Sequence, residues 1–270
     1  MRQHAGSQKL AVLFSGMGET ASTITIANRL ASAGYDVLRL YPKIQFFDFD
    51  LLDTKEKWDS GELRTFVRGG ALALATRYED MHRLVERFKQ MYGYSTVGVM
   101  GISLGGITAH YLSGSHPEMF QSTVGIITGG KLCEILLVSE EPRIKEISNK
   151  VFEKFTVTHD EARDILCEEL QEIDPLRVAD RIPAKQALLV SNIADQTIPY
   201  RFTKMLWRAA GRPAWKLMAL KLPFARGHES SGFALFFPVP LFQKWGCFYL
   251  PVWPQNADSL VLRHFESTLK

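Results

Sequence analysis

Short apolar runs alternate along this 270-residue chain with segments of helical periodicity, and this alternation restricts the fold more than any other feature. The apolar runs lie at 10–16, 35–42, 96–101, 122–130, 186–192 and 215–221. Most are apolar at consecutive positions, which is typical of strands covered on both faces, as in parallel sheets. The alternation predicts an α/β fold, in which a doubly wound, mostly parallel sheet of about six strands has right-handed crossovers.

Helical periodicity fills the segments between these runs. The clearest helix is predicted over 71–91, where apolar residues fall three or four apart and form one stripe. A second is predicted over 20–34, ended by Gly34, and a third over 203–210, between the last two strands. We therefore expect helices to cover the sheet.

The segment 131–182 interrupts this alternation, because it contains no candidate strand and is rich in charge. Thr158 and Glu161 have the spacing of a capping box, and apolar residues follow at helical spacing. We interpret 131–182 as a helical cap or lid inserted within a single domain that spans 1–270.

Composition and charge exclude several classes of function. Hydrophobic residues make up 46% of the chain and charged residues 23%, which is enough for a full core. The net charge is only +3 and the basic residues are scattered, so we expect no nucleic-acid partner. No run of about 18 apolar residues predicts a transmembrane helix. The longest apolar stretch, 233–253, is broken by prolines and Lys244.

The cysteines and the N-terminus favour a cytoplasmic protein. Cys133, Cys167 and Cys247 form no CxxC pair, their odd number predicts no complete disulfide framework, and metal-ligand spacing is absent. The first residues show no charged-then-apolar layout of a signal peptide. We expect no metal and no cofactor.

The stretch VGVMGISLGGITAHYLSG, residues 97–114, carries the strongest chemical signal. An apolar strand ends here in Gly101-Ile102-Ser103-Leu104-Gly105, and a helical pattern follows. A nucleophilic serine on a sharp strand-to-helix turn needs small residues two positions before and after it, and the helix N-terminus favours a developing oxyanion. The alternative is a glycine-rich turn with a structural serine.

With this motif in its strand–helix context, the chain from Leu10 to His228 resembles the α/β-hydrolases, a superfamily of serine hydrolases. The resemblance implies that a backbone oxyanion loop precedes the nucleophile and that an acid and then a histidine follow it. The loop candidate is LFSGMGET, residues 13–20, in which Ser15 replaces the family's usual histidine. By analogy, the Met17 and Leu104 amides form the oxyanion hole.

A dinucleotide-binding loop is the rival interpretation of Gly16 and Gly18 ahead of a helix. The third glycine of that fingerprint is absent, because position 21 is Ala21, and no acidic residue ends the next strand.

The acid and the base suggested by the resemblance are Asp195 and His228. Asp195 follows a predicted strand that ends at Asn192, and its alternative role is to cap a turn. His228 follows the last predicted strand, whereas His264 lies in a helix-like tail and is expected to be structural. Catalytic groups gather at the carboxyl ends of strands in such sheets, which is where all these candidates fall.

Together these features predict a hydrolase that cleaves a carboxylic ester or thioester of a small-molecule acyl substrate through an acyl-enzyme. The aromatic segment 233–253 could line an acyl pocket or touch a lipid surface, and it could equally pack as core or in a homodimer contact. The alternatives are a non-catalytic ligand-binding or scaffold protein of the same fold, or a peptidase or C–C hydrolase that uses the same triad.

Overall fold

A computed structural model of the chain describes residues 8–16, 21–41, 54, 56–193, 195–213, 217–220 and 257–269. Its centre is a six-stranded sheet in the order β2-β1-β3-β4-β5-β6, with every neighbouring pair parallel. The strands are β1 (Lys9–Phe14), β2 (Asp36–Leu40), β3 (Thr96–Ile102), β4 (Ser122–Ile126), β5 (Ala187–Asn192) and β6 (Leu217–Leu220). The predicted α/β fold with a parallel sheet of about six strands is confirmed.

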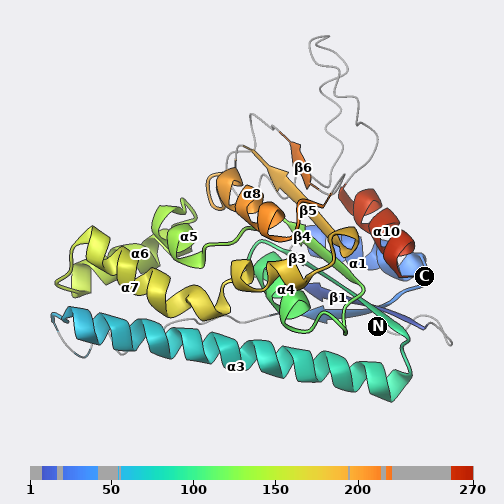
Figure 1. Cartoon of the computed structure of the whole chain (residues 1–270), viewed down its shortest axis with the longest axis horizontal. Helices are drawn as coiled ribbons and strands as arrows, with labels where there is room; N and C mark the ends of the chain where they lie inside the picture. The colour runs from blue at the N-terminus through green and yellow to red at the C-terminus, as the bar shows by residue number, and fades with distance from the viewer. Residues whose placement is uncertain are drawn as a thin grey trace, which may run out of the picture.

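Helices cover both faces of this sheet (Figure 1). On one face lie α3 (Ser60–Tyr92), α4 (Leu104–Ser115) and α8 (Tyr200–Ala209), and on the other lie α1 (Ala21–Ser32) and α10 (Ala257–Thr268). Strand β1 shows the alternation directly, because Leu10 and Val12 belong to the core of the α3–α4 face, whereas Ala11 and Leu13 belong to the other. No helix among the described residues is both long and apolar enough to span a bilayer.

Three helices lie between β4 and β5, where the sequence predicts a helical insertion. They are α5 (Leu132–Val138), α6 (Pro142–Lys154) and α7 (His159–Leu170), followed by four short 3₁₀ turns within 171–186. Thr158 caps α7 as its spacing predicts, since its hydroxyl accepts the Glu161 N–H at 3.2 Å. These helices, here called the helical lobe, lie beside the first half of α3 and away from the sheet (Figure 1).

Helix α3 begins well before the predicted residue 71. Asp59 is its N-cap, and its side chain accepts the Glu62 N–H at 2.8 Å while the Glu62 carboxylate accepts the Asp59 N–H at 2.8 Å. This capping box, together with burial of Phe66 against Phe155 of the lobe, holds the first turns in place. The predicted helix began too late, because the apolar residues of the first turns pack against the lobe rather than against the sheet.

Cys133 and Cys167 form a disulfide that joins α5 to α7. The odd number of cysteines excludes a complete disulfide framework, as predicted, but it does not exclude a single bond, and packing brings these two helices close enough to form one. They lie 34 residues apart in sequence, a spacing that carries no motif. The cysteine pattern therefore does not argue for a reducing compartment.

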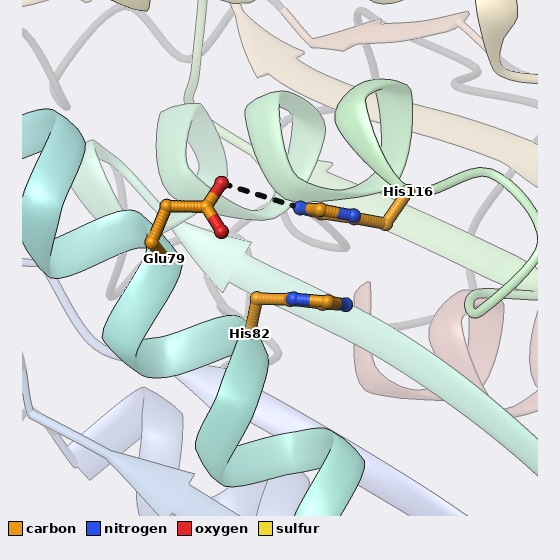
Figure 2. Close-up of side chains that lie close together, drawn as sticks. All are labelled: Glu79, His82 and His116. Carbon is orange, nitrogen blue, oxygen red and sulfur yellow. Dashed lines mark ion pairs between the residues drawn. The ribbon is translucent and has the colours of Figure 1, made fainter.

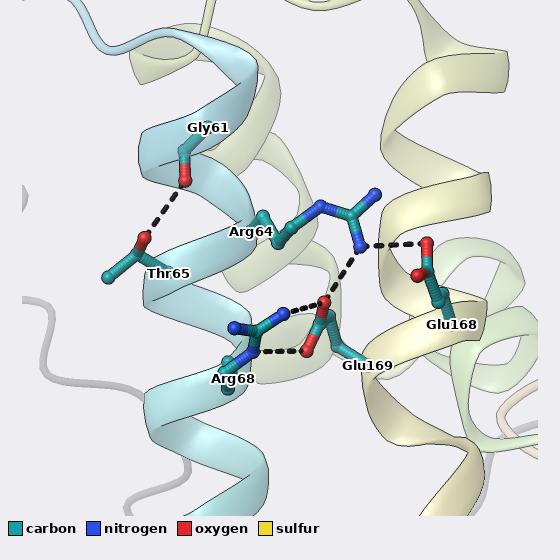
Figure 3. Close-up of polar contacts among 6 residues, drawn as sticks. All are labelled: Gly61, Arg64, Thr65, Arg68, Glu168 and Glu169. Atoms are coloured by element: carbon teal, nitrogen blue, oxygen red, sulfur yellow. Dashed lines mark hydrogen bonds and ion pairs between the residues drawn. The ribbon is translucent and has the colours of Figure 1, made fainter.

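Ion pairs also tie the lobe to α3 (Figure 3). Arg68 donates to both carboxylate oxygens of Glu169 at 2.9 Å, and Arg64 donates to Glu169 at 2.8 Å. Arg64 also lies 2.7 Å from Glu168, whose side chain is 59% exposed, whereas the Glu169 side chain is only 8% exposed. The hydrogen bonds from Arg68 and Arg64 lower the pKa of Glu169.

Replacing Glu169 with Gln should lower the free energy of unfolding by about 1 kcal/mol at pH 7, because both arginines lose a charged acceptor. A lowered folded-state pKa gives stability that is present above the unfolded value of about 4.3 and is lost as the pH falls through the folded value. The difference between wild type and Glu169→Gln in urea denaturation should therefore shrink at pH 3.5. Glu168→Gln is the matched control and should cost less; equal losses at both pH values would contradict the assignment.

Candidate active site

Ser103 lies at the tip of the turn that joins β3 to α4. Its backbone has φ of 58° and ψ of −124°, a combination that residues other than glycine rarely adopt. The Ser103 N–H donates to the Ile126 carbonyl of β4 at 2.8 Å, and the Ser103 carbonyl accepts the N–H groups of Gly106 and Ile107. The serine is thus fixed from both sides, by the neighbouring strand and by the first turn of the helix.

Three glycines make this turn possible. A Cβ built on Gly101 would lie 2.0 Å from the Gly105 carbonyl oxygen, and one on Gly105 would lie 2.2 Å from the Phe14 carbonyl oxygen. A Cβ on Gly106 would lie 2.7 Å from Cβ of Thr128, in the loop just after β4. Any side chain at these positions would push α4 away from the sheet, so the glycines set the close approach that the serine's conformation requires.

The loop after β1 passes directly beside Ser103. A Cβ on Gly16 would lie 3.4 Å from the Ser103 Cβ and 3.8 Å from its Oγ. Leu104 is the first residue of α4, and its N–H therefore has no acceptor within the helix. Met17, the other predicted oxyanion-hole residue, lies outside the described residues. The described chain thus places the start of the predicted oxyanion loop next to the serine.

Asp195 follows β5 and is buried, with 4% of its surface exposed. Its Oδ1 accepts the Thr197 N–H at 2.9 Å and the Ile198 N–H at 2.8 Å, and its own N–H donates to the Asn192 carbonyl at 3.2 Å. Two backbone bonds to a single carboxylate oxygen hold the side chain in one orientation. This includes the turn-capping role considered from the sequence, and it also presents a buried carboxylate at the strand end.

Ser103 and Asp195 lie at the same edge of the sheet, because β3, β4 and β5 are parallel neighbours and each residue comes just after its strand. Two strand spacings separate β3 from β5, about 10 Å between their axes. His228, the predicted base, lies outside the described residues. The structure therefore brings Ser103, Leu104 and Asp195 to one edge and leaves the role of His228 as a prediction.

Sequence reasoning missed a second strained residue at this edge. Ile127, which directly follows β4, has φ of 47°, although β-branched residues almost never adopt positive φ. Its N–H donates to the Val190 carbonyl at 2.7 Å, so β5 holds it in place. No sequence signal could have found it, because isoleucine is among the residues least expected in this conformation.

Two further histidines are buried within helices, and for His264 this agrees with the structural role expected from the sequence. His110 is fully buried in α4, where its Nδ1–H donates to the Gly106 carbonyl at 2.9 Å, and burial lowers its pKa to about 4. His264 is buried in α10, with its Nε2 2.9 Å from the Gln186 carbonyl oxygen.

Comparison with models of known protein families finds no match for this sequence, and comparison with curated protein sequences finds none either.

Solved structures with a similar arrangement do exist. The acetyl xylan esterase from Paenibacillus sp. R4 is 14% identical, with a TM-score of 0.56 over 87% of this chain and 71% of that one. The Pyrococcus furiosus esterase Pf2001 is 13% identical, with a TM-score of 0.52 over 98% of this chain and 85% of that one. The Pyrococcus horikoshii acylaminoacyl peptidase is 14% identical with a TM-score of 0.50; 82% of this chain is covered but only 33% of that longer protein. The chain therefore has the α/β-hydrolase fold.

Gly105→Ala should lower the free energy of unfolding by about 3 kcal/mol or more, because its Cβ would meet the Phe14 carbonyl at 2.2 Å. Gly69→Ala is the matched control, since nothing lies within 4 Å of a Cβ at that position in α3. The control should raise stability by roughly 0.5–1 kcal/mol, the usual gain of alanine over glycine in a helix. Urea denaturation measures both, and equal effects would contradict the crowding at the turn.

The lowered pKa of His110 makes stability depend on pH. Between about pH 6.5 and pH 4 the unfolded chain binds a proton here that the folded protein does not, so stability present above pH 6.5 is lost as the pH falls. The loss from this group should be roughly 3 kcal/mol at pH 4. It is measured as the difference in pH dependence between wild type and His110→Leu, with the exposed His159→Leu as control. A pH profile unchanged by His110→Leu would contradict this.

Proposed function

We propose that this protein is a serine hydrolase that cleaves a carboxylic ester or thioester, with Ser103 as nucleophile, His228 as general base and Asp195 as the acid that orients it. The proposal rests chiefly on one observation: the backbone of Ser103 is strained at a turn that three glycines permit. Strain of this kind persists only where the surrounding structure enforces it, and it is typical of functional sites. A structural serine in a glycine turn would need neither the positive φ nor the adjacent loop from β1.

The placement of Asp195 supports its role as the acid. About 10 Å between the axes of β3 and β5 leaves room for one imidazole to bridge the serine and the aspartate through a hydrogen bond on each nitrogen. The backbone bonds to Oδ1 of Asp195 would hold its carboxylate still while Oδ2 accepts the imidazole N–H. Such a bond fixes the tautomer that can take the serine proton.

The length of chain after β6 supports His228 as the base. His228 comes eight residues after Leu220, the last residue of β6, and β6 is three strands away from β3. Eight residues can span up to about 26 Å, whereas three strand spacings amount to about 14 Å. The connection is therefore long enough for the imidazole to reach Ser103.

In the proposed reaction, Ser103 Oγ attacks the carbonyl carbon of the substrate as His228 takes the serine proton. The Leu104 N–H, at the positive end of α4, and the Met17 N–H stabilise the oxyanion. The bond to the alcohol or thiol breaks as His228 returns the proton to the leaving group. Water then attacks the acyl-enzyme with His228 as base, releasing the carboxylic acid and restoring Ser103.

We propose an apolar acyl chain as the substrate's recognised part. The support comes from the sequence, where the aromatic segment 233–253 follows His228 directly; that segment lies outside the described residues. The esterases among the similar structures agree with an ester substrate. We further propose that the helical lobe acts as a cap over this substrate.

Ser103→Ala should abolish covalent labelling by a fluorophosphonate probe and lower turnover of p-nitrophenyl esters by about 10⁵–10⁶. Asp195→Asn should lower it by about 10⁴, because the imidazole then adopts the wrong tautomer. Ser113→Ala is the matched control, since that serine lies buried on the same helix and away from the turn. Wild-type rates in Ser103→Ala would refute the proposal, and absence of labelling in the wild type would favour a non-catalytic binding protein.

A further inference from the structure

Glu79, His82 and His116 form a cluster on the face where α3 meets the end of α4 (Figure 2). Glu79 and His82 are three residues apart on α3 and therefore share one side of that helix. His116 is the C-cap of α4 and comes from the facing element. None of these side chains takes part in the proposed hydrolysis.

The three side chains lie close enough to share one ligand. One donor atom from each falls within 4.8 Å of the other two, and the Glu79 carboxylate lies 3.5 Å from His116 Nε2. The rings of His82 and His116 are stacked, with centroids 3.5 Å apart and planes 4° from parallel (Figure 2). His116 Nε2 is buried and has no hydrogen-bond partner among the described residues, although the Glu79 carboxylate is its neighbour.

We propose that Glu79, His82 and His116 bind a divalent transition-metal ion of the Zn²⁺ type. Two imidazoles and a carboxylate are a common ligand set for zinc, and a water molecule can supply the fourth position. A Glu-x-x-His pair on one helix, as at 79–82, is also how helical bundles present metal ligands. Nitrogen and oxygen donors together favour this class over Mg²⁺ or Ca²⁺, which prefer oxygen alone.

The electrostatics of the location favour a cation. The carboxyl end of α4 carries the negative end of the helix dipole, and His116 sits at that end. Glu86 and Glu118 add negative potential at His82.

Metal binding requires a small rearrangement. Tetrahedral zinc with bonds of about 2.0–2.2 Å holds its ligand atoms roughly 3.3 Å apart. The donor atoms lie within 4.8 Å of one another, so the most distant pair must close by at most about 1.5 Å. Parallel stacked rings do not aim their lone pairs at one point, so at least one imidazole must turn about its side-chain bonds. Glu79 is half-exposed and His82 only partly buried, which leaves them free to adjust.

The site is separate from the candidate active site. Ser103 precedes α4 and His116 follows it, so about 20 Å of helix lies between them. The ion would join α3 to α4 on one face of the sheet, at the end of α4 opposite Ser103, and would not touch the substrate. The inference therefore does not depend on the proposed hydrolase activity.

Titration of the full-length protein with Zn²⁺ in an isothermal calorimeter tests the proposal. Wild type should bind one equivalent, and His82→Gln and His116→Gln should each weaken binding by more than about tenfold, because even loss of an outer-shell partner of a ligand costs about 10–100-fold in affinity. At a free Zn²⁺ concentration 100 times the dissociation constant, the Tm of the wild type should rise by roughly 5 °C, because the ion binds only the folded state.

His159→Gln is the matched control, because His159 is an exposed histidine on α7 outside the cluster, and it should bind Zn²⁺ like the wild type. Circular dichroism of each variant without metal shows whether it is folded, and Glu79→Gln provides a third ligand change at an exposed position. No binding to folded wild type would overturn the proposal. So would tight binding that survives both histidine changes, since the ion would then sit elsewhere, for example on cysteine.

Discussion

The close contact between α4 and the carboxyl edge of the sheet is the constraint on which the rest of the candidate site depends. Gly101, Gly105 and Gly106 leave no room for side chains between the helix and strands β1 and β4. That contact forces Ser103 into positive φ. It also places the first N–H groups of α4, the positive end of the helix dipole, beside Ser103 at the carboxyl edge of the sheet. The burial of the sheet on both faces then supplies the rigidity that keeps such a strained residue in place.

Much of this could be predicted from the sequence, because the signals are local. Consecutive apolar residues mark strands buried on both faces, and the G-x-S-x-G spacing reflects sterics within five residues. The position of Asp195 at the carboxyl end of the sheet could be predicted because it lies in the short loop that follows β5 (Ala187–Asn192). The cap of α7 at Thr158 is equally local and was also predicted correctly.

The features that escaped prediction arise from packing between distant segments. The start of α3 could have been found from Asp59 and Glu62, whose capping box is visible in the sequence, but its apolar face is explained only by the helical lobe. The Cys133–Cys167 disulfide and the pairing of His82 with His116 each join elements far apart in the chain. The backbone of Ile127 contradicts its own propensity, and only the neighbouring strand accounts for it.

Helix α3 packs against both the helical lobe and the sheet domain, so the lobe is not an independent unit even though 131–182 is one continuous segment of the chain. Its first turns bury Phe66 against the lobe, while its later turns bury Tyr78 against Tyr111 of α4. If the segment 131–182 were moved alone into another protein of this fold, the lobe would lose the surface of α3 against which it packs. Recombination between relatives of this protein should therefore succeed only when α3, the loop before it and the segment 131–182 all come from the same parent.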